Sequence, residues 1–279
     1  MRIFTKLLAA AGITAILFSC DKIEEGKYRQ AQTGTPGTDS TVFVRKVLLE
    51  EFTGHQCANC PEASATAQLL KQNYGEKLVV MGVHSAFFAR TNASGAFSYD
   101  FKTPAGNELN TTFAIGDNAP TGLVNRKGYP NAKKDVGDWG PNIDSLIGKD
   151  PWIGIKISST YNSGARAVDM TIESHYLTNL NSIYKLAVYV TEDSIVNWQK
   201  DKTTDIQNYV HRHVLRGAVK GTFGDTLSKV PAAKGSMYTK SYSYTLGADW
   251  NEKHCALVAV VFDAVTYEVI QVEEKHITH

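Results

Sequence analysis

The residues best suited to chemistry are two cysteines in one short segment, Cys57-Ala58-Asn59-Cys60-Pro61. An apolar, β-rich run at 42–52 precedes them and predicts a buried strand. Apolar residues at helical spacing in 62–74 predict a helix, and residues 78–83 predict a second buried strand. A cysteine at a helix N-terminus faces unpaired amides and the positive end of the helix dipole, which stabilise the thiolate. Cys57 is therefore expected to be the solvent-facing attacking thiol, and Cys60 to resolve the mixed disulfide.

Two other uses of the pair stay open at this point. A purely structural disulfide is one, although closing a four-residue loop contributes only about 2 kcal/mol, against about 4.7 kcal/mol for a 100-residue loop. A zinc site is the other, but it needs two further ligands, and the sequence has no second CxxC motif or nearby histidine pair. We expect neither a metal nor a cofactor.

The segment from Glu51 to Cys60, EFTGHQCANC, resembles the active-site segment of thioredoxins and protein disulfide isomerases. The resemblance implies that Glu51 is the buried carboxylate that relays a proton for Cys60. It also implies that Ala119-Pro120-Thr121 is the cis-proline segment, which lies beside the disulfide and pairs with an extended substrate backbone.

The chain departs from that family at two places. Gln56 stands where the family usually has Trp, and the dipeptide Ala58-Asn59 between the cysteines is not a common redox type. Oxidation, reduction and isomerisation of disulfides therefore cannot be separated from the motif.

Two histidines and a long aromatic segment lie near the expected site. His55 is either a positive charge that favours the thiolate or a solvated loop residue. His84 ends the second strand, where α/β sites form, so it either lines the same crevice or is an ordinary strand-end residue. Residues 86–118 carry six aromatic side chains and are expected to hold a helix around 107–113. They form either an aromatic wall for a ligand or a packed insertion.

The second half of the chain alternates like a β domain. Strands are expected at 152–160, 167–175, 184–190, 238–246, 255–263 and 267–273, which suggests an antiparallel, immunoglobulin-like sandwich. Cys255 lies in an apolar strand and is expected to be an inert core thiol. His211 and His213 would share one face of a strand, where a structural role is favoured over a metal site.

The first 41 residues have the pattern of a signal peptide followed by a tether. Positive Arg2 and Lys6 precede an apolar run at 7–18, and the run ends in Leu17-Phe18-Ser19-Cys20, which resembles a lipoprotein signal. Cys20 is therefore expected to carry lipid and to start the mature chain. The polar residues 21–41 are expected to form a flexible tether, and their first acids either resemble a surface-export signal or are simply solvated.

Composition excludes several classes of function. The chain of 279 residues is 43% hydrophobic, with 29 basic and 28 acidic side chains, so intrinsic disorder and nucleic-acid binding are both excluded.

The whole chain also resembles one narrower family. The lipoprotein signal, the segment 49–61 and the later segments 190–193 and 209–216 together resemble the twenty-eight-kilodalton outer-membrane lipoprotein family of Gram-negative bacteria. That resemblance implies a cell-envelope location at the outer membrane, and the export-like acids suggest its surface.

The expected architecture has four parts: a signal peptide at 1–19, a tether at 20–41, a thioredoxin-like α/β domain at 42–150 and a β-sandwich domain at 151–279. A fragment of residues 42–149 is expected to fold alone. The leading functional hypothesis is a lipid-anchored thiol–disulfide oxidoreductase whose partners are protein or peptide thiols and disulfides. The alternative is a non-enzymatic surface lipoprotein that binds a peptide, glycan or protein, with the first domain as scaffold.

Overall fold

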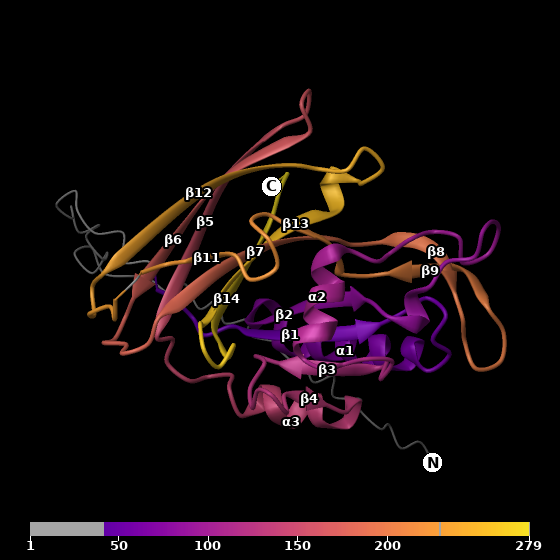
Figure 1. Ribbon diagram of the computed structural model, residues 1–279, viewed down its shortest axis with the longest axis horizontal. Coiled ribbons are helices and arrows are strands. Elements are labelled where there is room, and N and C mark those ends of the chain that lie inside the picture. The colour runs from indigo at the N-terminus through magenta and orange to yellow at the C-terminus, as the bar shows by residue number, and fades with distance from the viewer. Residues whose placement is uncertain (1–41, 229, 279) are drawn as a thin grey trace, which may run out of the picture. The chain divides into compact units, whose positions relative to one another are not determined.

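The computed structural model describes residues 42–228 and 230–278 of the chain (Figure 1). The predicted signal peptide, the lipidation residue Cys20 and the tether lie outside the described residues. Within the described residues, no helix has the length and apolar character needed to cross a membrane.

Parallel strands β1 (Val47–Thr53) and β2 (Leu78–His84) lie side by side inside a large mixed sheet. Every residue of both strands is buried, which explains why their sequences are mostly apolar without alternation. Glu50 and Glu51 in β1 are buried exceptions. The short strands β3 (Thr121–Val124) and β4 (Lys133–Lys134) extend the sheet beyond β1 in antiparallel pairing.

Three helices accompany these strands. Helix α1 (Cys60–Tyr74) has Pro61 in its first turn, where the missing amide breaks no helical bond, and ends at Gly75 with a φ of 57°. Helix α2 (Pro104–Thr112) begins at Thr103, whose hydroxyl accepts a hydrogen bond from the Gly106 amide at 2.9 Å. Helix α3 (Trp139–Asp144) and α1 pack on the same apolar cluster beside β1, β2 and β3.

The large sheet continues into the second half of the chain. Its strand order is β14-β13-β7-β10-β2-β1-β3-β4, and β11 (Asp225–Thr226) also pairs with β7. The strands added by the second half are β7 (Tyr184–Glu192), β10 (Val214–Ala218), β13 (Cys255–Asp263) and β14 (Val269–His276). Strand β10 joins the halves, because it pairs in parallel with β2 and antiparallel with β7.

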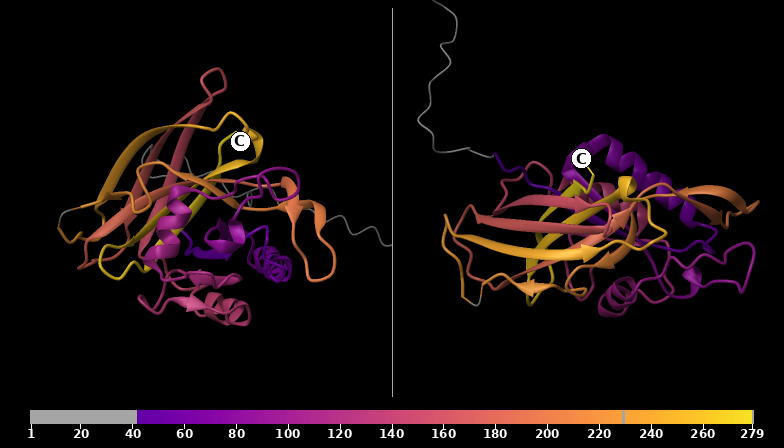
Figure 2. Two further views of the ribbon diagram at one scale, coloured as in Figure 1. Left: turned by 45° about the vertical axis from the view of Figure 1, so that its right-hand side comes forward. Right: turned by 90° about the horizontal axis from the view of Figure 1, so that it is seen from above.

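A smaller antiparallel sheet has the order β12-β6-β5 and comprises β5 (Ile153–Asn162), β6 (Ala167–Tyr176) and β12 (Met237–Thr245). Burial alternates along β6, as the period-2 pattern of its sequence predicts. One apolar cluster combines residues of this sheet, such as Ile155 and Ile172, with residues of the large sheet, such as Val188 and Leu257. The two sheets therefore enclose a common core, and Figure 2 shows them as neighbouring layers.

A mixed α/β fold with large sheets is thus what the structure establishes. Residues 42–278 belong to one compact unit, and a single cluster joins Leu48 and Val79 of the first half to Tyr189 and Val260 of the second. This differs from the expectation of separate cores on either side of residues 150 and 151. The change of sequence period near residue 150 marks the point where the chain enters the smaller sheet with β5. It does not separate two cores, because β10 later returns to the large sheet and pairs with β2.

One hairpin lies outside both of these sheets. Strands β8 (Ile195–Gln199) and β9 (Ile206–His211) pair only with each other, with an irregularity between Asn197 and Gln199. In Figures 1 and 2 this orange hairpin lies beside the purple segment that follows β2. The Trp198 ring of the hairpin contacts the Phe97 ring of that segment, with centroids 6.0 Å apart.

Candidate functional site

The two cysteines form a disulfide at the start of α1. Cys57 ends the loop after β1 and Cys60 is the first residue of the helix, with Cα atoms 5.4 Å apart. The loop passes close to the segment after β2, since the Gln56 amide donates to the Phe88 carbonyl oxygen at 2.9 Å. Gly54 permits that approach, because a Cβ at this position would collide with the Phe88 carbonyl group.

The prediction that Cys57 faces solvent is wrong. Cys57 is only 2% exposed and Cys60 only 1%. The β8–β9 hairpin is fastened to their loop: the Gln199 side-chain amide donates to the carbonyl oxygens of Cys57 at 3.0 Å and Gly54 at 3.3 Å. The Lys200 amide also donates to the His55 carbonyl oxygen at 2.7 Å. A segment far along the sequence therefore helps to cover the disulfide.

Glu51 lies in β1 behind the first turns of α1. Its carboxylate accepts a hydrogen bond from the Ser64 hydroxyl at 2.6 Å, and Ser64 stands one helical turn after Cys60 on the same helix face. Burial raises the pKa of Glu51 to about 7, and the Ser64 hydrogen bond opposes that rise. A carboxyl group that titrates near neutral pH is suited to exchange a proton with a nearby thiol.

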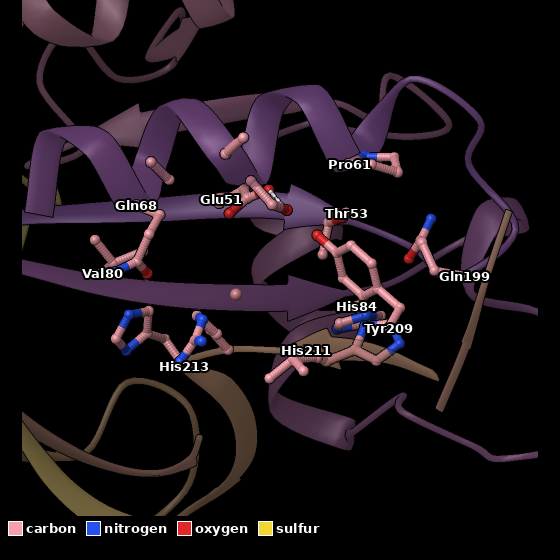
Figure 3. Close-up of a pocket in the computed structure, with 16 residues that line it drawn as sticks. Glu51, Thr53, Pro61, Gln68, Val80, His84, Gln199, Tyr209, His211 and His213 are labelled. Carbon is pink, nitrogen blue, oxygen red and sulfur yellow. Dashed lines mark hydrogen bonds between the residues drawn. The ribbon is translucent and has the colours of Figure 1, made fainter. Parts of the chain in front are cut away.

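A cavity of about 290 Å³ opens beside Glu51 (Figure 3). Side chains of α1, β1 and β2 line it together with side chains from β9 and the residues after it, among them Ser64, His84, Tyr209, His211 and His213. His84 thus lines the cavity that holds Glu51, at the carboxyl end of β2. Neither ring nitrogen of His84 has a hydrogen-bond partner among the described residues.

Two histidines of the cavity, His84 and His211, are packed against an aromatic ring. His84 stacks on Phe101 with centroids 4.5 Å apart, and His211 contacts the same ring at 4.4 Å. Burial lowers the pKa of His211 to about 4 and that of His84 well below its ordinary value. This packing accounts for Phe101 and Phe97 of the aromatic segment as parts of the fold's own interior.

His55 differs from both expectations for it. Its side chain is fully buried, and its Nε2 bonds the Arg90 carbonyl oxygen at 2.7 Å, so it is not a solvated loop histidine. Burial lowers the pKa of His55, which disfavours the positively charged form that was expected to favour a Cys57 thiolate. His55 instead holds the segment after β2 against the cysteine loop.

The expected cis-proline segment is present as a structural feature. The Ala119–Pro120 peptide bond is cis, as the resemblance implied, and Thr121 begins β3 directly after it. Thr121 pairs with Phe52 in β1, the residue after Glu51, so the segment lies at the same end of the sheet as the cysteine loop. A groove there is lined by Phe88, Asn118, Ala119 and Pro120, among others.

The remaining candidates from the sequence are His211, His213 and Cys255, and the two histidines both line the cavity beside Glu51. His211 ends β9, whereas His213 has a φ of 51° and pairs with Asp193 at 3.3 Å, so the two do not share a strand face. No group of three or more His, Cys, Asp or Glu side chains in residues 42–228 and 230–278 is arranged to hold a metal ion. Cys255 is buried in β13, where burial raises the pKa of its thiol to about 12.

Sequence reasoning missed three side chains of the site: Ser64, Gln199 and Tyr209. Ser64 had a usable signal, because it lies four residues after Cys60 and therefore on the same helix face. Gln199 had none, since its short strand with polar residues has no clear period. Tyr209 begins the segment 209–216 that carried the family resemblance, but nothing in the sequence placed it near the cysteines.

Fold and site together define a mixed α/β protein with a covered CxxC disulfide backed by a buried acid. Residues 110–279 match the outer membrane protein Omp28 family, and the chain belongs to that family. Its location is accordingly the outer membrane of the cell envelope. No curated protein sequence matches the chain.

Two solved structures share the fold at low sequence identity, and a third matches over a smaller part of this chain. HBP35 of Porphyromonas gingivalis is 18% identical with a TM-score of 0.63, over 85% of this chain and 76% of that one. A protein of Agrobacterium tumefaciens is 16% identical with a TM-score of 0.50, over 83% of this chain and 94% of that one. A domain of the outer membrane lipoprotein Omp28 from Porphyromonas gingivalis is 25% identical with a TM-score of 0.30, over 46% of this chain and 90% of that one.

Proposed function

We propose that the chain is a thiol–disulfide oxidoreductase that acts on protein or peptide disulfides and is anchored to the outer membrane through lipid on Cys20. The first half is a thioredoxin-like unit, and the later strands form a β-sandwich fused to it through β10. One observation carries the proposal: Glu51, with a pKa of about 7, is held by Ser64 one turn behind Cys60 of the Cys57–Cys60 pair.

The reaction begins from the reduced pair. The Cys57 thiolate attacks one sulfur of a substrate disulfide, and the other substrate sulfur leaves as a thiolate. Cys60 then gives its thiol proton to Glu51 and attacks Cys57 in the mixed disulfide. The bond between Cys57 and substrate breaks, its electron pair leaves with the second substrate sulfur, and two electrons have passed to the substrate. A dithiol partner returns the pair to its reduced state by the reverse steps.

Substrate selection follows from the cover over the pair. Both cysteines are buried, so a disulfide partner must displace part of the hairpin or of the segment after β2 before Cys57 can attack. The cis Ala119–Pro120 segment, with Thr121 beside it, is the edge against which an extended substrate backbone would pair.

Trapping of mixed disulfides tests the proposal. In full-length protein carrying Cys255→Ala, which removes the remaining described thiol, Cys60→Ser should capture envelope proteins as mixed disulfides because attack occurs without resolution. Cys57→Ser is the matched control and should capture none. Equal capture by both variants, or by neither, would count against the proposal.

The redox potential gives a second, independent measurement. A potential below about −300 mV is typical of a structural disulfide, whereas an exchanging pair is less reducing. A value in the structural range together with no trapping would leave the first half as a scaffold. The chain would then be a surface lipoprotein that binds a peptide, glycan or protein partner without catalysis.

A further inference from the structure

Strand β12 forms one edge of the smaller sheet, in which it pairs with β6 alone. Figure 1 shows it at the outer margin of that sheet. Its nine residues keep one register with β6 from end to end, and they include neither proline nor glycine. Proteins commonly protect an edge strand with a proline, a bulge or a short length, because unpaired backbone groups at an edge can pair with another chain. Strand β12 has none of these three protections.

The backbone groups that β12 presents at this edge follow from its pairing. Beyond one end of the strand, the Leu246 amide donates to the Arg166 carbonyl oxygen. Beyond the other end, the Tyr176 amide donates to the Ser236 carbonyl oxygen. Both pairs continue the register of β12 with β6, so the even-numbered residues of β12 carry its hydrogen bonds to β6. The odd-numbered residues therefore direct their N–H and C=O groups away from β6: Met237, Thr239, Ser241, Ser243 and Thr245.

The two edges of the smaller sheet differ in what covers them. All five outward-facing residues of β12 are exposed. On β5, the same alternation directs Ile153, Ile155 and Ile157 outward, and all three are buried. The Lys275 side chain of β14 also donates to the Ile157 carbonyl oxygen at 3.4 Å. The fold itself therefore closes the β5 edge and leaves the β12 edge open.

We propose that the open edge of β12 pairs antiparallel with the same edge of a second copy of this chain, joining the two smaller sheets into one. The two-fold axis passes through Ser241, which pairs with Ser241 of the second copy. Thr239 then lies opposite Ser243, and Met237 lies opposite Thr245. In this register every outward-facing residue has a partner, and each pair exchanges two backbone hydrogen bonds. The inference goes beyond the proposed redox function and does not depend on it.

The side chains in this register favour a second copy over an unrelated strand. Around the axis, the opposing side chains on the exposed face are hydroxyls, and no two like charges lie directly opposite each other. On the other face, Lys240 lies opposite Tyr242 of the second copy, whose hydroxyl donates to Asp225 Oδ2 at 3.0 Å. Lys240 belongs to none of the ion pairs in the described part of the chain. The positive charge that would keep other strands from this edge is therefore matched by Asp225 of the second copy.

Disulfide cross-linking tests both the edge and its register. Opposing residues in a hydrogen-bonded antiparallel pair have Cα atoms about 5.5 Å apart, which a disulfide can span. In purified full-length protein with the Cys57–Cys60 disulfide intact, Ser241→Cys should form covalent dimers under mild oxidation.

Thr239→Cys and Ser243→Cys are the matched controls, because both residues are exposed on the same edge. Each alone should yield at least about tenfold less covalent dimer than Ser241→Cys, since its Cα atom lies roughly 14 Å from the equivalent atom of the second copy. A mixture of the two variants should cross-link, because Thr239 lies opposite Ser243.

Sedimentation equilibrium measures the pairing without an introduced cysteine. Ser241→Pro removes an outward N–H group and leaves the hydrogen bonds between β12 and β6 in place, because Ser241 takes no part in them. The dissociation constant of the dimer should rise roughly thirtyfold, since each copy loses one hydrogen bond at the axis. Thr171→Ala is the control. Thr171 contacts the Ser241 hydroxyl from β6 at 3.0 Å, and its loss should leave the dimer unchanged.

Several outcomes would overturn the proposal. A wild-type protein that stays monomeric at every concentration, or Ser241→Cys without covalent dimers, would leave the edge unpaired. Equal cross-linking by Thr239→Cys alone and Ser243→Cys alone would show collision without the proposed register. If Ser241→Cys in isolated cell envelopes captures a different protein in place of a second copy, the edge belongs to another partner.

Discussion

At the scale of single residues, Glu51 was the most predictable part of the site. The spacing from Glu51 to Cys57 carried the resemblance to thioredoxins, and the structure places the carboxyl group in the interior behind α1. His55 was not predictable in the same way. Its burial depends on the Arg90 carbonyl and on Phe97 and Phe101, whose positions no local pattern specifies.

The raised pKa of Glu51 makes its effect on stability depend on pH. Because its pKa is about 7 in the folded protein against an ordinary value of 4.5, the native state holds the proton more tightly than the unfolded state. The resulting stabilisation is complete below pH 4.5 and is lost as the pH rises through 7. Relative to wild type, Glu51→Gln should gain about 3 kcal/mol of unfolding free energy between pH 4 and pH 8.

Urea unfolding of the oxidised protein at pH 4, 6 and 8 measures this difference. Glu62→Gln is the matched control, because that carboxylate lies in the first turn of α1, near Glu51 in β1, but is exposed to solvent. Parallel stability curves for wild type and Glu51→Gln across this range would contradict the prediction.

At the scale of elements, long strands were predicted well and short ones were not. The expected strands at 167–175 and 255–263 correspond to β6 and β13 within one residue, because eight or more residues with consistent burial give a clear period. Strands β8 and β9 have five and six residues and an irregular register. These two strands are held in place by contacts with the cysteine loop, which is far away in the sequence.

Gln199 should control how often the hairpin leaves the cysteines. Gln199→Ala removes the hydrogen bonds to the Cys57 and Gly54 carbonyl oxygens, worth about 1 kcal/mol each. Opening should therefore become roughly thirtyfold more frequent, and alkylation of reduced Cys57 should accelerate by that factor.

The measurement is the alkylation rate of the reduced protein, with the modified cysteine identified by mass spectrometry. Val196→Ala serves as the control on the outer side of the hairpin. If Gln199→Ala alkylates at the wild-type rate, the hairpin is not what limits access to the pair.

At the scale of the whole molecule, a buried ion pair of the first half is hydrogen-bonded to a tyrosine of the second half. Arg126 donates to both carboxylate oxygens of Glu50 at 2.7 and 2.8 Å and to the Tyr189 hydroxyl at 3.0 Å, and both charged side chains are fully buried. The sequence showed a turn at Arg126 and a strand containing Tyr189, but no pattern in it relates the two. Such a contact between distant elements becomes visible only in three dimensions.

Removing one partner of this pair should destabilise the entire unit. Arg126→Met leaves the Glu50 carboxylate buried and unpaired, which typically costs about 3–5 kcal/mol. Tyr189→Phe, which removes only the hydroxyl, should cost about 1 kcal/mol.

Urea denaturation followed by both circular dichroism and tryptophan fluorescence tests this prediction. Because the halves share one sheet and one core, we expect a single transition that moves to lower urea in Arg126→Met. A variant in which only part of the signal shifts would instead support two independently folding domains with a boundary near residue 150.

The position of β10 between β2 and β7 also governs when the fold can form during export. A chain that crosses the inner membrane N-terminus first delivers β1 and β2 long before residues 214–218 emerge to occupy the neighbouring place in the sheet. Until then one edge of β2, a strand of mostly apolar residues, has unpaired backbone N–H and C=O groups, and such an edge can pair with another chain and aggregate. The residues just before β1 also wait for the C-terminal strand, because the Gln271 side chain in β14 accepts a hydrogen bond from the Lys46 amide and donates one to the Val44 carbonyl oxygen. We therefore expect the exported chain to be most prone to aggregation before residues 214–218 have emerged.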